Sequence, residues 1–269
     1  MRLVGTLFAL GLLLLPGLAQ AQDVSDRERS RIERILRRTP VIDGHNDLPW
    51  AIRDDHGNDL EAIDLTSDTR RIDPPLHTDF PRLRAGGVGA QFWSVYVPAS
   101  NRGLENTRMV FEQIDLARRM IARYPRQLEF ADSAADIVRI HRAGRIASLF
   151  GIEGGEAINN NLALLRSFRR AGVTYMTLTH STSNDWVDSA TDAPRHNGLA
   201  PFGEDVVREM NRIGMFVDLS HVSPDAMRAV LRISAAPVIF SHSSAYAIAH
   251  HPRNVPDDVL AMLPANGGV

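Results

Sequence analysis

The segment Val41–Trp50, VIDGHNDLPW, combines a histidine with two aspartates directly after an apolar run. If Val41–Asp47 forms a strand, side chains alternate between its two faces, so His45 and Asp47 project to the same side. One imidazole and one carboxylate placed in this way can bind a divalent transition metal. The H-x-D pair alone is a weak signal for a metal site, so the interpretation depends on whether other segments supply further possible ligands.

Four later apolar runs also end in a residue that can bind a metal. Ile146–Glu153 ends in a carboxylate, and three further runs end in His180, His221 and His242. Any one of these histidines could instead be a core or rim residue, but their recurrence on one predicted face, with Asp47, indicates a metal site. The remaining histidines fall in predicted loops or on helix surfaces, where we expect no ligand role: His56, His77, His141, His196, His250 and His251.

Imidazole and carboxylate ligands suit zinc, with manganese or cobalt as substitutes. Four such ligands could serve one ion, whereas five, with one carboxylate able to bridge, better suit two ions about 3.5–4 Å apart. The 269 residues contain no lysine, which excludes a lysine-derived bridge and leaves Glu153 as the natural bridging ligand. A metal-bound hydroxide at such a centre would attack a polarised carbonyl group.

The composition is that of an ordinary globular protein with one large domain or two small ones, since 44% of the residues are hydrophobic and the formal net charge is −2. This near-neutral charge gives no support for binding to nucleic acid. The absence of cysteine excludes disulfides, zinc–thiolate sites and cysteine nucleophiles.

Residues 1–21 have the features of a cleavable signal peptide, namely Arg2, the apolar run Leu7–Leu15 and the A-x-A site Ala19–Ala21. The apolar run is short for a membrane span, and an uncleaved anchor is the alternative. We therefore expect export to the periplasm or secretion, with residues 22–269 as the folded part.

Short apolar strands alternate with amphipathic helices along the rest of the chain, apart from Arg53–Gly86, which is predicted to be a long loop. Such alternation predicts an α/β fold with a parallel sheet, and ligand residues at successive strand ends are typical of a (β/α)8 TIM barrel. A doubly wound sheet is the alternative, but it places its site at one switch point between strands. The predicted strands are 41–47, 87–97, 146–153, 173–180, 215–221 and 236–242, and the predicted helices are 23–38, 104–124, 133–142, 159–171, 204–213 and 223–233.

A closed barrel needs eight βα units, and the sequence supplies about six of them. After the sixth predicted strand come a short helix at 257–263 and a turn at 266–268, and Val269 would be the first residue of a seventh strand. The barrel domain is therefore expected to be incomplete at its C-terminus, with strand edges left open.

Six separate segments resemble the membrane (renal) dipeptidase family of dinuclear zinc peptidases: PVIDGHNDLPW, GVGAQFWSVY, GIEGGEAI, TLTHSTSN, DLSHVS and PVIFSHSSAYAIAHHPRNVPDDVL. The resemblance implies that residues 22–269 form a metal-dependent hydrolase domain that binds two zinc ions and hydrolyses dipeptides. In that case His45 and Asp47 bind one ion, His221 and His242 bind the other, and Glu153 bridges them.

Three further residues match positions that the family uses on its substrate. The resemblance implies that His180 contacts the substrate and stabilises the tetrahedral intermediate, Arg253 holds the terminal carboxylate, and Trp50 forms a pocket wall. For Arg253 the alternative is a surface ion pair with Asp257 or Asp258, worth about 0–1 kcal/mol. The family is often dimeric, so the resemblance also allows a homodimer.

One element implied by the resemblance is missing from the sequence. The family's catalytic aspartate lies in a Gly-Asp-Phe-Asp-Gly-like segment on the last barrel strand, and no such segment occurs in residues 1–269. Two other functions therefore stay open: another metal-dependent amidohydrolase, such as a deacylase or lactonase, and a non-catalytic metal- or peptide-binding protein. The amidohydrolases commonly show H-x-H on the first strand and a modified lysine bridge, so Asp47 and the absence of lysine argue against them.

Overall fold

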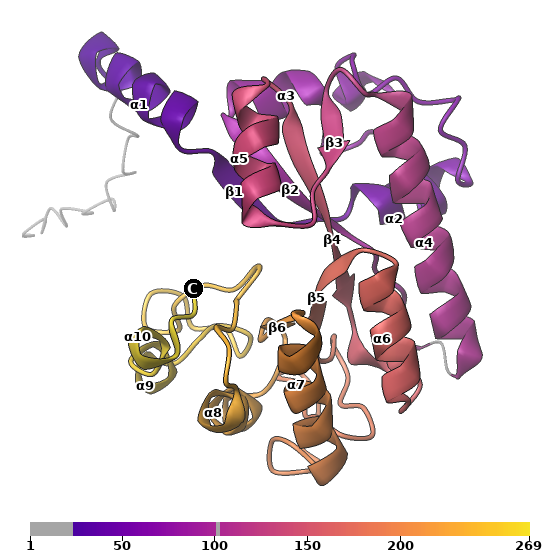
Figure 1. Cartoon of the computed structure of the whole chain (residues 1–269), viewed down its shortest axis with the longest axis vertical. Coiled ribbons are helices and arrows are strands. Elements are labelled where there is room, and N and C mark those ends of the chain that lie inside the picture. Colours follow the sequence, from indigo (N-terminus) through magenta and orange to yellow (C-terminus); the bar gives the residue numbers. More distant parts are fainter. Residues whose placement is uncertain (1–23, 101–102) are drawn as a thin grey trace, which may run out of the picture.

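The computed structural model describes residues 24–100 and 103–269, and the predicted signal peptide lies outside these residues. Within them, parallel strands form one sheet that curls into a half-barrel (Figure 1). The order along the sheet is β1 (Val41–Asn46), β2 (Val88–Ser94), β4 (Ile146–Glu153), β5 (Val173–Thr177) and β6 (Phe216–Asp218).

The strand order confirms the predicted barrel-type α/β fold and argues against the doubly wound alternative. Neighbouring strands follow the order of the chain around the sheet, without the reversal that creates a switch point. Each neighbouring pair is parallel. All C-terminal strand ends therefore lie on one edge of the half-barrel, where the sequence predicts the site.

The central strand β4 is buried along its whole length, as its apolar sequence predicts. Phe150 and Ile152 belong to the large hydrophobic cluster between the sheet and its helices, whereas Ala147 and Leu149 belong to a smaller cluster on the opposite face. Alternation places Glu153, the last residue of the strand, on the face of Ala147 and Leu149. The carboxylate is thereby directed to the inner side of the half-barrel.

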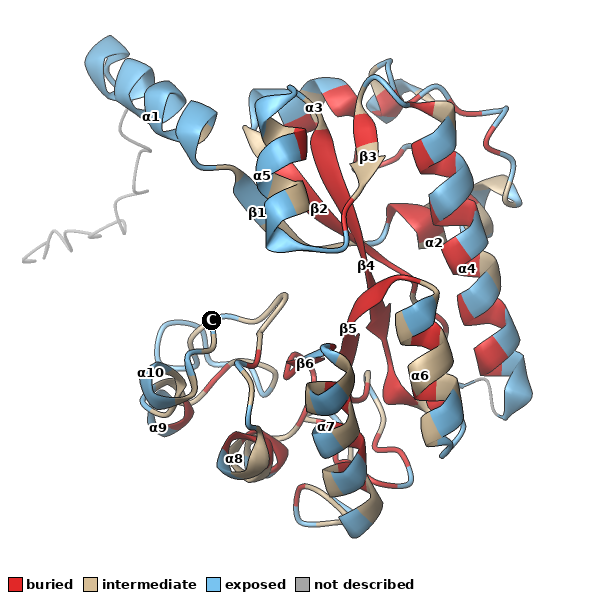
Figure 2. Cartoon of the chain, in the orientation of Figure 1, coloured by how far each residue is buried: buried red, intermediate tan, exposed pale blue. Residues whose placement is uncertain are grey.

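Helices α4, α6, α7 and α8 pack on the outer face of the sheet, and α5 packs against β2 and β4 on the other face (Figures 1 and 2). The capping residues predicted at the start of α8 are found at that position. Ser223 accepts a hydrogen bond from the amide of Ala226, and Pro224 occupies the first turn of α8. The helix bounds are α4 Leu104–Arg123, α5 Ala134–Arg142, α6 Leu162–Arg170, α7 Pro201–Ile213, α8 Pro224–Ile233, α9 Asp257–Leu260 and α10 Leu263–Asn266.

Helix α1 (Asp26–Arg38) projects from the half-barrel and has no buried residue (Figure 2). Ser25 and Glu28 form a reciprocal capping box at its start, so the predicted helix is confirmed from Asp26 onward. None of the helices in the described part of the chain is long and apolar enough to cross a membrane.

The prediction of one long loop at 53–86 is wrong in part. This stretch contains the end of α2 (Leu48–His56), the 3-10 turn η1 (Thr69–Arg71) and α3 (Phe80–Ala85). Buried Asp79 caps α3 and accepts a hydrogen bond from the amide of Thr69 at 3.2 Å. Elements this short carry no readable periodicity, and the three-residue strand β3 (Leu128–Phe130), which pairs with the start of β4, escapes prediction for the same reason.

The predicted sixth strand, 236–242, is an extended segment with a single bridge to β6 rather than a full strand. Ile239 exchanges two backbone hydrogen bonds with residues 217–219, of 3.0 and 2.8 Å. On its other side, Val269 makes two backbone hydrogen bonds to the same segment, of 2.9 and 3.2 Å. Pro237 has no amide hydrogen to add to the ladder, which shortens the pairing. The segment nevertheless occupies the position after β6 and carries His242 to the common edge.

Gly44 lies in β1 where the strand meets this extended segment. A β-carbon on Gly44 would lie 2.3 Å from the backbone oxygen of Ser241. We expect Gly44→Ala to lower the free energy of unfolding by about 1–3 kcal/mol through overpacking, as measured by urea denaturation. Gly86→Ala is the matched control, because a β-carbon there would meet nothing closer than 3.4 Å. Equal losses in the two variants would contradict this explanation.

Candidate metal centre

Two of the predicted ligands lie at the end of β1. His45 is in the strand, and Asp47 is the residue before α2. The Nε2 atom of His45 lies 3.1 Å from Oδ1 of Asp47, so the two side chains meet, although Asp47 lies in the turn beyond the strand. The Asp47 side chain is 58% exposed and the His45 side chain 9% exposed. Asp47 therefore forms the solvent-facing side of the site.

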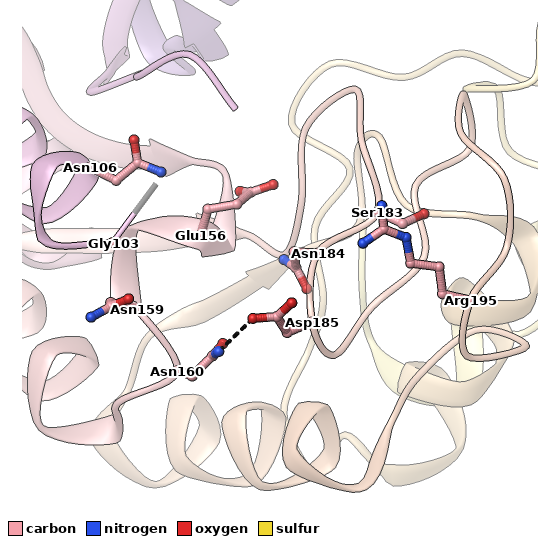
Figure 3. Close-up of a pocket in the computed structure, with 9 residues that line it drawn as sticks. All are labelled: Gly103, Asn106, Glu156, Asn159, Asn160, Ser183, Asn184, Asp185 and Arg195. Atoms are coloured by element: carbon pink, nitrogen blue, oxygen red, sulfur yellow. Dashed lines mark hydrogen bonds between the residues drawn. The ribbon is translucent and has the colours of Figure 1, made fainter. Parts of the chain in front are cut away.

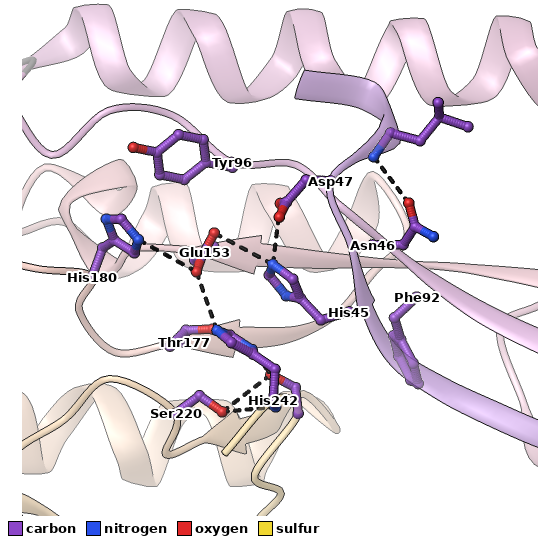
Figure 4. Close-up of polar contacts among 12 residues, drawn as sticks. His45, Asn46, Asp47, Phe92, Tyr96, Glu153, Thr177, His180, Ser220 and His242 are labelled. Atoms are coloured by element: carbon purple, nitrogen blue, oxygen red, sulfur yellow. Dashed lines mark hydrogen bonds and ion pairs between the residues drawn. The ribbon is translucent and has the colours of Figure 1, made fainter. Parts of the chain in front are cut away.

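Glu153 lies at the centre of the site (Figure 4). Its Oε1 atom lies 2.9 Å from Nε2 of His221, 3.3 Å from Nε2 of His242 and 3.6 Å from Nε2 of His180. Its Oε2 atom lies 3.5 Å from Nε2 of His45. Four histidines from four segments of the barrel edge therefore converge on one buried carboxylate.

His180 and His221 each lie three residues beyond a strand that is shorter than predicted, β5 and β6 respectively. His221 has a left-handed backbone with φ 70°, which is rare for a residue with a β-carbon. The loop that follows β5 makes hydrogen bonds to the backbone of both histidines. The amide of Ala190 donates to the carbonyl of His221 at 2.8 Å, and the hydroxyl of Ser189 donates to the carbonyl of His180 at 2.7 Å.

Among the described residues, two groups of three could each hold an ion: His45, Glu153 and His242 form one, and Glu153, His180 and His221 form the other. This grouping differs from the pairing that the resemblance implies, because His242 lies with His45 and His180 lies with His221. The Nε2 atoms of His221 and His242 are 2.9 Å apart, so these two could also share an ion. The donors are imidazole nitrogens and carboxylate oxygens, a set that fits zinc.

The charges in the site follow from burial and from contacts with Glu153. Burial opposes a charge on His45, but its hydrogen bonds to Asp47 and Glu153 raise its pKa to about 10. Burial also opposes a charge on Glu153, but contacts with His221, His242 and His45 hold the pKa of that carboxyl well below its usual range. Burial lowers the pKa of His221 to about 4. Glu153 is therefore an anion and His221 a neutral imidazole, the forms that bind metals.

Arg253 is half-buried beside the histidines. Its Nε and Nη2 atoms have no hydrogen-bond partner among the residues that the structure describes, and its charge adds to burial in lowering the pKa of His180 and of His221. The structure does not show the alternative ion pair with Asp258, which pairs instead with Arg228 at 2.7 Å. Buried donors without partners are costly, so this planar guanidinium is suited to a ligand with a carboxylate.

A row of aromatic rings leads from α2 to His180. Trp50 packs edge-on against Tyr96 with 5.1 Å between ring centroids, and Tyr96 packs against His180 at 5.0 Å. Tyr96 was not among the residues predicted for the site (Figure 4). Its position two residues after β2, at the edge that carries the ligands, is the signal that could have identified it.

Two cavities of the described structure lie among the segments that follow the C-terminal ends of the strands. One, of about 460 Å³, is lined by His45 and Asp47 and also by His77, for which no role was expected. The other, of about 200 Å³, is mostly polar and lies between the segments that follow β4 and β5 (Figure 3). The first cavity opens onto two of the predicted ligands, and its lining does not include Trp50, His180 or Arg253. The lining of the second consists of Gly103, Asn106, Glu156, Asn159, Asn160, Ser183, Asn184, Asp185 and Arg195.

Comparison with known sequences agrees with this geometry. Residues 29–269 match the family model of membrane dipeptidase, peptidase family M19. The chain is 44% identical over 248 residues to dipeptidase 3 of Mus musculus, covering 90% of this chain and 48% of that protein. It is 44% identical over 255 residues to dipeptidase verJ of Clonostachys rogersoniana, covering 91% of this chain and 64% of that protein. The chain thus spans about half of one relative and less than two-thirds of the other.

The fold is shared with solved structures. A metallo peptidase from Rhodobacter sphaeroides, solved with a phosphinate mimic of the dipeptide L-Ala-D-Ala, matches with a TM-score of 0.74 at 24% identity. The match covers 86% of this chain and 72% of that chain. This likeness supports the barrel-type fold, and the family model extends over all of the sheet. The chain belongs to the membrane dipeptidase family, peptidase family M19.

Proposed function

We propose that this protein hydrolyses dipeptides at a centre of two zinc ions. The observation that carries the proposal is Glu153, a buried anion whose oxygens lie within 3.6 Å of four imidazole nitrogens. Bound zinc would polarise the scissile carbonyl and lower the pKa of water at the centre. The names of the two curated relatives, both dipeptidases, support a dipeptide as the substrate.

The residues of this chain have distinct roles in the proposal. Arg253 binds the terminal carboxylate of the substrate, and because that carboxylate lies one residue beyond the cut, longer peptides are excluded. Burial lowers the pKa of His180, so its neutral imidazole can donate a hydrogen bond to the developing oxyanion, a contribution of about 3–4 kcal/mol. Trp50 and Tyr96 form a wall beside His180. The ligands of the ions are His45, Asp47, Glu153, His221 and His242.

Export is part of the same proposal, and its support is the signal-like sequence of residues 1–21. A dipeptidase outside the cytoplasm would act on peptides before they are taken up. The sequence further favours dipeptides over the substrates of deacylases and lactonases, because Asp47 replaces the second histidine of H-x-H and no lysine is available as a bridge.

The purified full-length protein is expected to bind about two zinc ions per chain and to hydrolyse a simple dipeptide such as L-Ala-L-Ala. Metal content is measured by mass spectrometry and hydrolysis by release of free amine. Removing the metal with a chelator should abolish hydrolysis, and adding zinc should restore it. The matched control is the dipeptide amide, which lacks the carboxylate that Arg253 would bind and should react about 100-fold more slowly.

Two results would contradict the proposal. Binding of two zinc ions without hydrolysis of any dipeptide would favour a non-catalytic binding protein. Hydrolysis of N-acyl amino acids or lactones in place of dipeptides would favour another amidohydrolase.

A further inference from the structure

Asp218, the last residue of β6, is a fully buried carboxylate outside the predicted set of ligands. Its Oδ2 atom accepts hydrogen bonds from the hydroxyls of Thr177 at 2.5 Å and Ser241 at 2.6 Å. Its Oδ1 atom accepts from the backbone amides of Ser220 at 3.1 Å and Ser241 at 3.0 Å. Asp218 therefore joins the ends of β5 and β6 to the extended segment that carries His242.

The hydrogen bonds around Asp218 determine which nitrogen of His242 carries the proton. The Ser241 hydroxyl has one proton, and at 2.6 Å from a carboxylate oxygen it donates that proton to Asp218. The same hydroxyl oxygen lies 2.7 Å from Nδ1 of His242, so Nδ1 must be the donor in that contact. His242 is then protonated on Nδ1, and the lone pair of its Nε2 faces Glu153 at 3.3 Å.

The Nδ1 atom of His45 is likewise held as a hydrogen-bond donor, by a different group. The buried hydroxyl of Tyr175 donates to the carbonyl of Gly44 at 3.0 Å. It lies 3.0 Å from Nδ1 of His45, and because its proton is already used, it accepts from that nitrogen. The other ring nitrogen of His45, Nε2, therefore faces Asp47 and Glu153, and a metal bound there would take the place of the proton on this nitrogen.

We propose that the Asp218–Ser241 pair and Tyr175 are positioning residues that present Nε2 of His242 and of His45 to the metal. This proposal rests on the metal centre proposed above. Histidines that bind metals generally need such a partner on the other ring nitrogen, because it fixes both the tautomer and the orientation of the ring. The Asp218–Ser241 pair contacts His242 and Tyr175 contacts His45, and these two histidines form one group of possible ligands with Glu153.

The test is the zinc affinity of the purified protein, measured by competition with a chromophoric chelator. Ser241→Ala is expected to weaken the binding of one ion by about 10–100-fold, and Ser241→Thr, which keeps the hydroxyl, should restore most of it. Tyr175→Phe should weaken binding by a similar factor while keeping the ring. Ser148→Ala is the matched control, since Ser148 is a buried strand serine whose hydroxyl has no hydrogen-bond partner in the described part of the chain.

Thermal unfolding of the metal-free variants verifies that each one folds. A folded Ser241→Ala or Tyr175→Phe variant that binds zinc as tightly as the parent would overturn the role of the residue concerned. An equal loss in Ser148→Ala would overturn the proposal as a whole, because the effect would then be general. If the parent protein itself binds no zinc, the proposed function fails instead.

Discussion

Replacing Glu153 by glutamine is expected to remove at least one of the two proposed metal ions and to lower turnover of dipeptides by about 1000-fold or more. The carboxylate is 5% exposed and meets four histidines, so the neutral amide would remove the charge that is common to the two groups of possible ligands among the described residues. An amide also directs two N–H donors at nitrogens that must offer lone pairs to a metal. Replacing a residue that only hydrogen-bonds to a metal ligand already lowers metal affinity or activity by about 10–100-fold. Loss of a ligand shared by two ions should therefore lower both by more.

Metal content and steady-state kinetics of Glu153→Gln test this expectation. Glu156→Gln is the control, because it makes the same chemical change three residues away, outside both ligand groups. The control should keep its metal. Retention of two ions by Glu153→Gln would show that this residue is not a bridge, even if activity were lost.

Arg253→Ala is expected to lower kcat/KM for dipeptides by about 100–1000-fold, mainly through KM. Removing one partner of a buried charge pair costs about 2–5 kcal/mol, and two nitrogens of the Arg253 guanidinium have no partner within residues 24–100 and 103–269. Arg253→Lys should lose less, because the charge is kept, but it should not restore the parent activity, because the two-pronged geometry is lost.

The comparison of dipeptide with dipeptide amide makes this test specific. In the parent protein the free carboxylate should be strongly preferred, and in Arg253→Ala that preference should disappear. Arg228→Ala is the matched control, since Arg228 forms a surface ion pair with Asp258 and its loss should leave KM unchanged. Normal dipeptide hydrolysis by Arg253→Ala would refute its assignment as the carboxylate anchor.

The side chains that meet around Glu153, and the edge of the sheet at which they meet, could be predicted from the sequence. Each of Glu153, His180, His221 and His242 follows an apolar run, and a residue's place after a strand is a local property that composition and spacing encode. The C-terminal ends of parallel strands meet at one edge, so the convergence of these side chains follows from topology alone. Capping patterns such as Ser223-Pro224 are local in the same way.

Short helices and strands could not be predicted in this way, and neither could the pairs of side chains that contact each other in the site. The start of α3 is stabilised by the buried Asp79 side chain, which accepts hydrogen bonds from the amides of Arg82 and Thr69. Strand β3 is only three residues long. Such elements offer too few residues for a period of 2 or 3.6 to be recognised. The grouping of His242 with His45 likewise depends on how far the sheet curls, which no local pattern records.

The tertiary structure alone decided how the histidines are held. The hydroxyl of Tyr175 reaches His45 across 130 residues of sequence, and Asp218 reaches Ser241 across 23. Nothing in the neighbourhood of Tyr175 or Asp218 distinguishes them from other residues of apolar strands. A local pattern fixes the strand on which a side chain stands, but a hydrogen bond between strands requires two side chains to meet at about 3 Å, and that is set by the curvature and register of the whole sheet.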